Sequence, residues 1–392
     1  MLRSLFSGIS GLKAHQTMLD VAGNNIANVN TTGFKSSQTQ FQDTLSQMLT
    51  SPGAAQAGVG GTNPAQVGLG VKVAGITTNF QQGAAQLTNR STDMMISGDG
   101  FFTVRSGNEQ MYTRSGSFNF DSVGQLVTAD GALVQGWAAT NGVVDTNAAL
   151  TDLKLPIGTL MGAKATTAAT YGGNLPSDAV VGTTMTKAVD VFDDLGVKQS
   201  LNLTFTRTGA GWDVSANRGG GAAVTSAMTF TAATGAIATG GSLTVGGVVV
   251  DLSKVTGFAG VTSIEASGQD GQEAGNLQSF ALESDGTLMG SFSNGLKQAI
   301  GQLAIATFTN PTGLEKSGGS SYRTTVNSGA AQVGTAGTAG RGTLVGGALE
   351  MSNVDLSSEF TNLIIAQRGF QANARVITTS DQLLEELVNL KR

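Results

Sequence analysis

The sequence predicts a protein of mixed, mainly β structure with one long α-helix at each end of the chain. Apolar residues recur every three or four positions near both termini, and they alternate with polar residues in between. Gly and Asp also mark turns at short spacing throughout the middle of the chain. We expect the terminal helices to pair as a coiled-coil-like stem, with two nested all-β domains of the sandwich or barrel type inserted between them.

The first helix is expected over residues 2–28. Its apolar residues fall on positions spaced alternately by three and four, with Gln16 as a polar break, which is the heptad spacing of a helix that packs along one stripe of its surface. At 1.5 Å per residue, about 25 residues of such a helix span about 38 Å. The stripe, which we call the helix seam, is formed here by Leu5, Ile9, Leu12, Leu19 and Ile26.

The second helix is expected over residues 353–391, with a longer apolar stripe. Residues 352–355 supply a polar N-cap with an acid in the first turn, and two cations end the chain, as helix termini favour. The two stripes can pair within one chain, or they can pack between subunits; a head-to-tail contact that does not close into a ring then builds a helical filament. The second part of the helix seam consists of Leu356, Phe360, Leu363, Phe370, Ile377, Leu384 and Val388.

Between the helices the pattern becomes that of short strands. Residues 201–206 alternate apolar and polar side chains, and residues 303–308 form the continuous apolar run of a buried strand. The composition shifts near residues 145 and 285, because the segment between them is richer in Thr, Val and Gly. The expected β domains are a first domain of residues 72–144 plus 285–327 and an inserted outer domain of residues 145–284.

Two further stretches are expected to connect the helices to the β domains. Both are rich in Gly, and small, flexible residues are typical of linkers. The predicted organisation is therefore an N-terminal helix in residues 1–30, a connector in 31–71, a Gly-rich linker in 328–352 and a C-terminal helix in 353–392.

The residue inventory argues against an enzyme. With no Cys and one His, the chain lacks disulfides, thiolate sites and multi-His metal centres, and a serine triad would need His15 on the flank of a helix. Asp190, Asp193 and Asp194 precede a Leu-Gly turn and are interpreted as solvated carboxylates. The Gly-rich residues 334–340 lack the Lys-Ser/Thr of a phosphate loop. We expect no catalytic residue, no cofactor and no metal ion.

Charge and hydropathy limit the classes of partner that this chain is expected to bind. The formal net charge is −5 and no block of Lys and Arg is present, which argues against nucleic-acid binding. No apolar run reaches the roughly 18 residues of a membrane helix, so no membrane insertion is expected. Lys13 and His15 interrupt the apolar residues at the N-terminus, which therefore does not resemble a cleavable signal peptide.

Several longer motifs are more specific. Just after the first helix the chain reads Asn24-Asn25-Ile26-Ala27-Asn28, followed by Gly33-Phe34-Lys35. These residues resemble the N-terminal signature of the rod and hook proteins of the bacterial flagellum. The same resemblance continues in residues 96–102, 112–118, 347–356 and 366–373, and it covers about 1–140 and 275–392.

The inserted segment indicates the branch of the family. Short rod proteins lack a large insertion, whereas residues 145–284 fill that place here. Residues 191–197, residues 201–205 and Trp212 resemble the insertion of the hook branch. The distal rod branch is the first alternative, and a secreted surface-layer or adhesin subunit is the second.

The resemblance implies a structural subunit that stacks helically into a short curved tube, a universal joint that transmits torque from rod to filament. It implies partners too: further copies of this chain, the distal rod protein, the hook cap, the hook–filament junction proteins and the flagellar type III export apparatus. The implied location is extracellular, reached without a cleaved signal. Phe41 and Leu45 resemble the aromatic-x-x-x-apolar element read by the export gate, although this spacing also fits an ordinary amphipathic turn.

Overall fold

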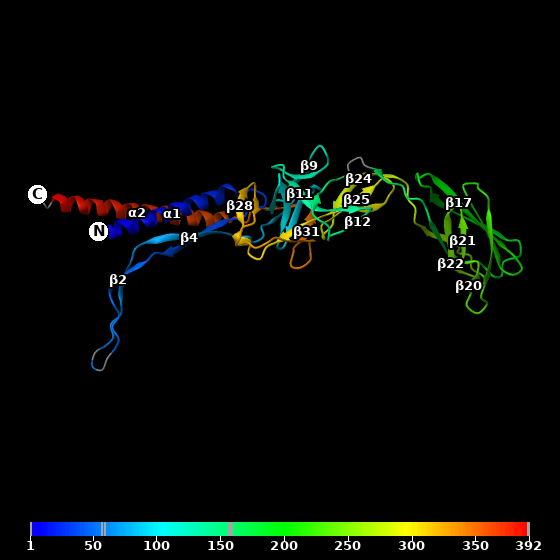
Figure 1. The fold of residues 1–392 in the computed structure, drawn as a ribbon, viewed down its shortest axis with the longest axis horizontal. Helices are drawn as coiled ribbons and strands as arrows, with labels where there is room; N and C mark the ends of the chain where they lie inside the picture. The colour runs from blue at the N-terminus through cyan, green and yellow to red at the C-terminus, as the bar shows by residue number, and fades with distance from the viewer. Residues whose placement is uncertain (1, 56–57, 59, 156–159, 390–392) are drawn as a thin grey trace. The chain divides into compact units, whose positions relative to one another are not determined.

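The computed structural model describes residues 2–55, 58, 60–155 and 160–389. The chain forms two compact units. Both terminal helices belong to the first unit, and the described residues between them form β-strands joined by turns and loops, with one 3-10 turn (Figure 1). The predicted mainly β fold with a helix at each end is confirmed. Unit 1 comprises Met1–Leu155, Ala281–Met289 and Ala299–Arg392, and unit 2 comprises Pro156–Phe280 and Gly290–Gln298.

The two helices lie side by side (Figure 1). They are α1, Leu2–Ala27, and α2, Leu356–Asn389, and Asp355 caps α2 by accepting a hydrogen bond from the Ser357 backbone at 2.9 Å. Small residues form the buried contact, which lets the helix backbones approach closely. A Cβ on Gly11, for example, would lie 2.7 Å from the Asn373 amide. The buried positions are Gly8, Gly11, Ala14, Ala22 and Asn25 in α1, and Ala366 and Ser380 in α2.

The connector expected at 31–71 contains strands, which corrects the prediction. β1, Ser37–Asp43, pairs antiparallel with β4, Val71–Thr78, and β2, Ser46–Thr50, pairs with β3, Ala65–Gly68. The backbone of Val71 donates to Oγ of Ser10 at 3.2 Å, so this ribbon is tied to α1. Antiparallel pairing satisfies the backbone locally, and composition alone does not show it.

The β structure of unit 1 is built around aromatic side chains. Phe101 lies in T-shaped contact with Phe80, Phe308 and Tyr322, at centroid distances of 5.3 to 5.8 Å among the four rings. One sheet path runs β11-β7-β8-β29-β28. The further elements of this unit are β5 Ala85–Leu87, β6 Met94–Ser97, β7 Phe101–Ser106, β8 Glu109–Thr113, β9 Phe118–Phe120, β10 Leu126–Thr128, β11 Leu133–Thr140, β12 Val143–Val144, β13 Thr151–Asp152, β27 Ile305–Thr307, the 3-10 turn η1 Pro311–Gly313, β28 Glu315–Gly318, β29 Ser321–Arg323, β30 Gln332–Gly334, β31 Thr343–Gly346 and β32 Ala348–Glu350.

The linker expected at 328–352 is also part of the β structure. β30 pairs with β27, β31 with β6, and β32 with β5. Glycine serves close approach here rather than flexibility, because a Cβ on Gly342 would lie within 3 Å of Ser97 backbone atoms. The run expected as one strand at 303–308 is divided between β26 and β27 at Ala304.

Unit 2 consists mainly of two sheets with strand orders β21-β22-β15-β23 and β16-β17-β18-β19-β20. The alternation at 201–206 is observed: Leu201, Leu203 and Phe205 are fully buried in a core that includes Trp212. Its strands are β14 Leu160–Met161, β15 Ala168–Asn174, β16 Thr184–Phe192, β17 Lys198–Arg207, β18 Trp212–Arg218, β19 Val224–Phe230, β20 Ile237–Thr239, β21 Ser242–Val245, β22 Val248–Thr256 and β23 Glu265–Gln269.

The boundaries of the insertion differ from the expected 145 and 284. Residues 145–155 belong to unit 1, because β13 pairs with β11 and Asp152 forms an ion pair with Arg105 at 2.5 Å. Near the other end the chain passes between the units three times, within strands that extend across the boundary. Continuous strands leave no linker signal in composition. These strands are β24 Gly275–Leu282, β25 Thr287–Phe292 and β26 Lys297–Leu303.

Candidate functional site at the base of the helix pair

Three of the sequence motifs meet where the helix pair joins the β structure of unit 1. We call this place the junction, and it is formed by residues 24–37, 81–83, 112–116 and 347–355. The first segment leaves α1 and the last leads into α2, so both ends of the chain are anchored here. The contacts that join them are polar and buried.

Glu350 is the centre of the junction. Its Oε1 accepts from Lys35 Nζ at 2.6 Å and from the Gly83 backbone at 2.9 Å, and its Oε2 lies 3.3 Å from Arg114 Nη1. The side chains of Glu350 and Lys35 are fully buried, and that of Arg114 is 2% exposed. Buried charges require such partners, since an isolated ion away from water is costly. One carboxylate therefore holds three other segments of the chain.

The electrostatics of this cluster are set by burial. Desolvation lowers the pKa of Lys35, while its hydrogen bond to Glu350 acts in the opposite direction. Burial likewise raises the pKa of Tyr322, and the nearby charge of Arg114 opposes this shift. Lys35 Nζ also donates to the Gln81 carbonyl at 2.7 Å, so two of its three protons are placed.

The contacts at the junction explain why the family motif after α1 has these residues. The Asn25 side chain is completely buried; its amide donates to the Ser37 carbonyl at 2.8 Å and to Glu359 of α2 at 2.9 Å, and its oxygen accepts from the Ser37 backbone at 3.0 Å. Gly33 has φ of 68° and a backbone N–H that donates to the Glu350 carbonyl at 2.7 Å. A Cβ there would meet the Ser115 backbone at 2.5 Å, so only glycine fits.

The other motif residues complete the turn that follows α1. The Asn28 side chain donates to the Asn24 carbonyl at 2.9 Å, and the Asn28 backbone donates to the same oxygen at 3.2 Å, so Asn28 closes the end of the helix twice. Phe34 lies beneath Lys316, whose Nζ is 5.1 Å from the ring centroid. Ile26 and Ala27 are the last helical residues and are half-buried and exposed, respectively.

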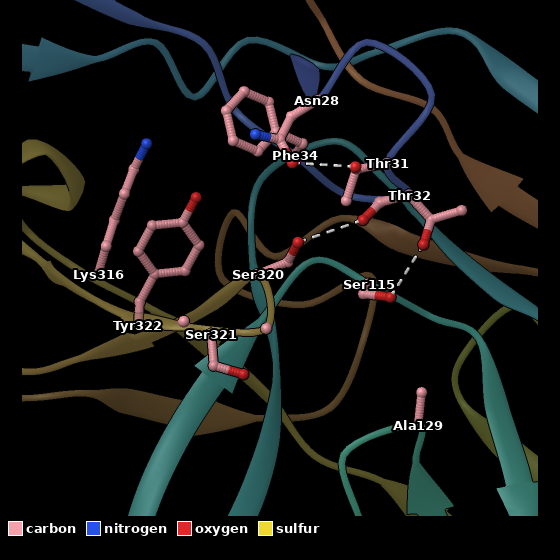
Figure 2. A pocket seen from close by; sticks show the side chains of 12 residues that line it. Asn28, Thr31, Thr32, Phe34, Ser115, Ala129, Lys316, Ser320, Ser321 and Tyr322 are labelled. Atoms are coloured by element: carbon pink, nitrogen blue, oxygen red, sulfur yellow. Dashed lines mark hydrogen bonds between the residues drawn. The ribbon is translucent and has the colours of Figure 1, made fainter. Parts of the chain in front are cut away.

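A cavity of about 400 Å³ lies beside this turn (Figure 2). Its rim is held by hydroxyl contacts: Thr32 bonds Ser115 at 3.3 Å, and Ser320 donates to the Thr32 carbonyl at 3.4 Å. Phe34, Lys316 and Tyr322 also line it, with no carboxylate among the lining residues. The arrangement offers packing and hydrogen bonding but no acid–base pair for catalysis.

Sequence reasoning did not single out the charged residues of the junction. Lys35, Arg114 and Glu350 lie inside quoted motifs, but the motifs are far apart in the chain and no spacing rule pairs them. Asn353 was likewise missed: its amide donates to the Asn79 and Gln81 carbonyls at 2.8 and 3.0 Å, and its oxygen accepts from the Ser36 backbone at 2.8 Å. The presence of a charged residue within each motif is the sequence signal that could have pointed to Lys35, Arg114 and Glu350.

The helix seam lies beside the buried helix contact rather than within it. Ile377 does face α1, since a Cβ on Gly8 would lie 3.3 Å from its Cγ1. The structure thus shows the helices paired within one chain. Half-buried seam residues are Leu5, Ile9, Leu12, Leu19, Ile26, Leu363, Phe370, Ile377 and Leu384. Exposed seam residues are Leu356, Phe360 and Val388.

The two residues of the export element lie in the ribbon after the junction. Phe41, in β1, is 40% exposed, and its ring centroid is 6.0 Å from that of His15. Leu45 follows β1 and is 83% exposed. Neither side chain is needed to fill a core.

Two absences hold for the part of the chain that the structure describes. No helix in that part of the chain combines the length and apolar character needed to cross a membrane. Across the same residues, no three His, Asp or Glu side chains are grouped so that they could hold a metal ion.

Comparison with known families defines the class of protein. Residues 5–35 match the flagella basal body rod protein family, residues 95–167 match the flagellar hook protein FlgE/F/G D1 domain, and residues 345–390 match the flagellar basal body rod FlgEFG protein C-terminal family. The first match contains most of α1 and most of the junction segment that follows it, and the last match contains the junction segment before α2 together with α2. The class of protein is therefore that of the rod and hook proteins of the bacterial flagellum.

Individual relatives identify the branch. The chain is 40% identical over the whole length of both proteins to the flagellar hook protein FlgE of Borreliella burgdorferi, and 35% identical, again over both full lengths, to the flagellar basal-body rod protein FlgG of Bacillus subtilis. The crystal structure of Helicobacter pylori flagellar hook protein FlgE2 has the same kind of fold, with a TM-score of 0.54, 14% identity, and coverage of 68% of this chain and 99% of that one. The chain belongs to the flagellar hook protein family and is a structural subunit of the hook; the rod alternative is not favoured.

Proposed function

We propose that this hook subunit polymerises helically with copies of itself into a short curved tube, which transmits torque from rod to filament as a universal joint. It does so as a structural element without catalysis or cofactor. The observation that carries this proposal is the distribution of side chains on the helix pair. Small residues fill the contact within the chain, and larger apolar residues face outward.

The helix pair exposes several large apolar side chains on its outward surface. Phe6 is 63% exposed, Phe360 51% and Ile364 56%, and further apolar side chains continue along α2. Exposed apolar stripes mark contact surfaces, because they remain in water only until a partner covers them. The half-buried helix seam beside them would then be covered by neighbouring helices of other copies, which would build the inner wall of the tube. The further exposed apolar residues of α2 are Leu356, Ile365, Val376, Leu383, Leu387 and Val388.

The surface of unit 2 suits contacts that change as a tube bends. Its edge and outer strand positions carry small polar side chains, as in the hydroxyl pairs Thr186–Thr204 at 3.2 Å and Thr229–Thr239 at 2.7 Å, both exposed. Exposed hydroxyls exchange partners with water at little net cost, because a hydrogen bond gains only about 1 kcal/mol over solvation. Outer contacts of this kind would slide rather than lock.

The remaining partners follow from the proposed place in the flagellum. The tube would join the distal rod protein at one end and the hook–filament junction proteins at the other, and it would grow beneath the hook cap. The subunit would reach the extracellular hook through the flagellar type III export apparatus without a cleaved signal, with Phe41 and Leu45 as the export element. Neither nucleic acid nor membrane insertion has a part in this role.

Polymerisation is tested by making the outward helix surface polar. The double variant Phe360→Ser and Ile364→Ser should prevent tube formation by purified protein, as seen by light scattering and electron microscopy, while circular dichroism shows that the β units stay folded. The matched control is Val326→Ser, which changes a fully exposed apolar residue of the β structure. Tubes of normal length from the double variant would contradict the proposal.

Location is tested in cells, using the absence of native cysteine. Ala210→Cys lies in an exposed turn of unit 2 and should label with an impermeant maleimide dye. A short labelled spot at the base of each filament is expected. Labelling that needs a permeabilised envelope would favour the rod instead, and a uniform halo would favour a surface layer.

A further inference from the structure

We propose that the Lys35–Glu350–Arg114 cluster is a lock that makes the ordering of the two chain ends mutually dependent. In this view the segment after α1 and the segment before α2 become ordered together, or neither does. The lock goes beyond polymerisation, because it concerns how one chain closes its own junction.

The first step is that the lock needs both ends of the chain. Lys35 and Glu350 are 315 residues apart and their charged atoms meet at 2.6 Å, with both side chains fully buried. The Gly33 backbone donates to the Glu350 carbonyl beside this pair. If the segment of Glu350 left the junction, Lys35 would keep a buried charge without a carboxylate; if the segment of Lys35 left, Glu350 would keep only Arg114, at 3.3 Å, as a charged partner.

The second step is that the helices give this arrangement little independent support. The fully buried residues of their contact are no larger than Ala, Ser or Asn, as at Ala22, Ala366 and Ser380, and the larger seam residues stay half exposed, so pairing removes only part of the apolar area of the helices from water. Helices in proteins also owe most of their stability to tertiary packing rather than to intrinsic propensity. Order in the helix pair therefore depends on the base where Asn25 and Glu359 bond each other at 2.9 Å.

The third step concerns what a buried ion cluster contributes. Such a cluster adds little net stability compared with apolar packing, but it makes every partly assembled arrangement costly. Arg114 comes from the β structure and is nearly as buried as the pair. It supplies a preformed positive socket, so the arriving Glu350 has one partner before Lys35 is placed.

Hydrogen exchange of the full-length chain tests the lock, both in free protein and in polymer. In the natural chain, protection of residues 24–37 and 350–365 should rise and fall together in both states, whatever the level in the free protein. Glu350→Gln and Lys35→Met should each speed exchange at both segments by at least about tenfold, although each changes one end only. Residues 201–218 of unit 2 serve as the internal reference.

Two further variants make the outcome decisive. The triple variant Lys35→Met, Arg114→Met and Glu350→Gln removes all three buried charges of the cluster and should restore most of the protection lost in either single variant. Glu109→Gln breaks the half-exposed pair with Arg323 at 3.0 Å and should leave both ends unchanged. Absence of polymer from Glu350→Gln, with recovery in the triple variant, also supports the lock. Loosening of the mutated end alone, or a triple variant no better than the singles, overturns it.

Discussion

The imidazole ring of His15 in α1 packs against the bare backbone of Gly369 in α2, so closely that a Cβ at position 369 would lie 2.5 Å from Nε2. Gly369→Ala should therefore push the helices apart. Overpacking costs about 1–3 kcal/mol, and the gain in helix propensity recovers up to about 1 kcal/mol, so a net loss is expected. Thermal unfolding of the helices, followed by circular dichroism at 222 nm (a standard helix wavelength) in polymerised protein, measures it.

Gly23→Ala is the matched control for this change. No atom lies within 4 Å of a Cβ at that position, which is exposed within α1. The same substitution should there stabilise the helix by up to about 1 kcal/mol. If both alanines shift the transition in the same direction, the close contact at Gly369 is not what limits the helix approach.

This contact shows why the sequence predicted the helices but not their buried face. Heptad spacing marked both helices correctly, because any apolar stripe at that period requires a helix. Gly8, Gly11 and Asn25 each precede a residue of the helix seam by one position, and they form the buried side instead. Glycine and asparagine carry no hydrophobic signal, so no periodicity analysis selects them. Only the geometry of two approaching backbones does.

The β structure was likewise predictable from the sequence only in part. Alternation at Leu201, Leu203 and Phe205 predicted a strand correctly, because successive side chains of a strand point to opposite faces of the sheet. The Gly-rich stretches were interpreted as linkers, yet Gly342 lies against Ser97 within a paired strand region. Pairing partners far apart in the chain decide such cases. The ion cluster around Glu350 was out of reach for the same reason.

Asn25 provides a second prediction at the junction. Asn25→Ala removes three hydrogen bonds and leaves the partly buried Ser37 backbone N–H without its acceptor. The expected loss is about 2–3 kcal/mol, most of it from the unsatisfied groups. Chemical denaturation of the full chain, with a probe attached to the helix pair, measures it. Asn30→Ala is the control, because Asn30 is exposed, and it should change stability by less than about 0.5 kcal/mol. An equal loss of unfolding free energy in both variants would mean that the hydrogen bonds of Asn25 do not stabilise the junction.

The export element allows stability and secretion to be separated. Leu45→Ala changes a side chain that is 83% exposed, so the folded protein should keep its transition temperature within about 1 °C. Secretion through the export apparatus should nevertheless fall if the unfolded chain is read at this residue, and Phe41→Ala should act in the same direction. Immunoblots of culture medium against cell extract measure the secreted fraction. Leu87→Ala, at a residue 75% exposed, is the control. Unchanged secretion of both variants would leave the pair as ordinary surface residues.

Asp270 should give unit 2 an acid-dependent component of stability. Burial acts to raise the pKa of this carboxyl, but hydrogen bonds from the Thr167 hydroxyl at 2.6 Å and from the Ala168 and Thr167 backbones at 2.8 Å, with Lys164 nearby, lower it to about 2 from an ordinary 3.8. A carboxyl group whose pKa is lower in the folded than in the unfolded protein contributes its full stabilisation at pH values above its pKa in the unfolded chain. That contribution is lost as the pH falls from about 4 to about 2.

Asp270→Asn should accordingly cost unit 2 about 1 kcal/mol near pH 6, allowing for solvent screening of a carboxylate that is 34% exposed, and almost nothing near pH 2. Denaturant titrations at the two pH values measure the difference. The chain has two Trp residues, so the variant is best made together with Trp137→Phe, which leaves the buried Trp212 as a reporter of unit 2 alone. Lys164→Met separates the causes: it removes only the weak ion pair at 3.8 Å, so most of the pH dependence should survive. If instead Asp270→Asn destabilises equally at both pH values, the hydrogen bonds favour the carboxyl group as such and not its ionised form.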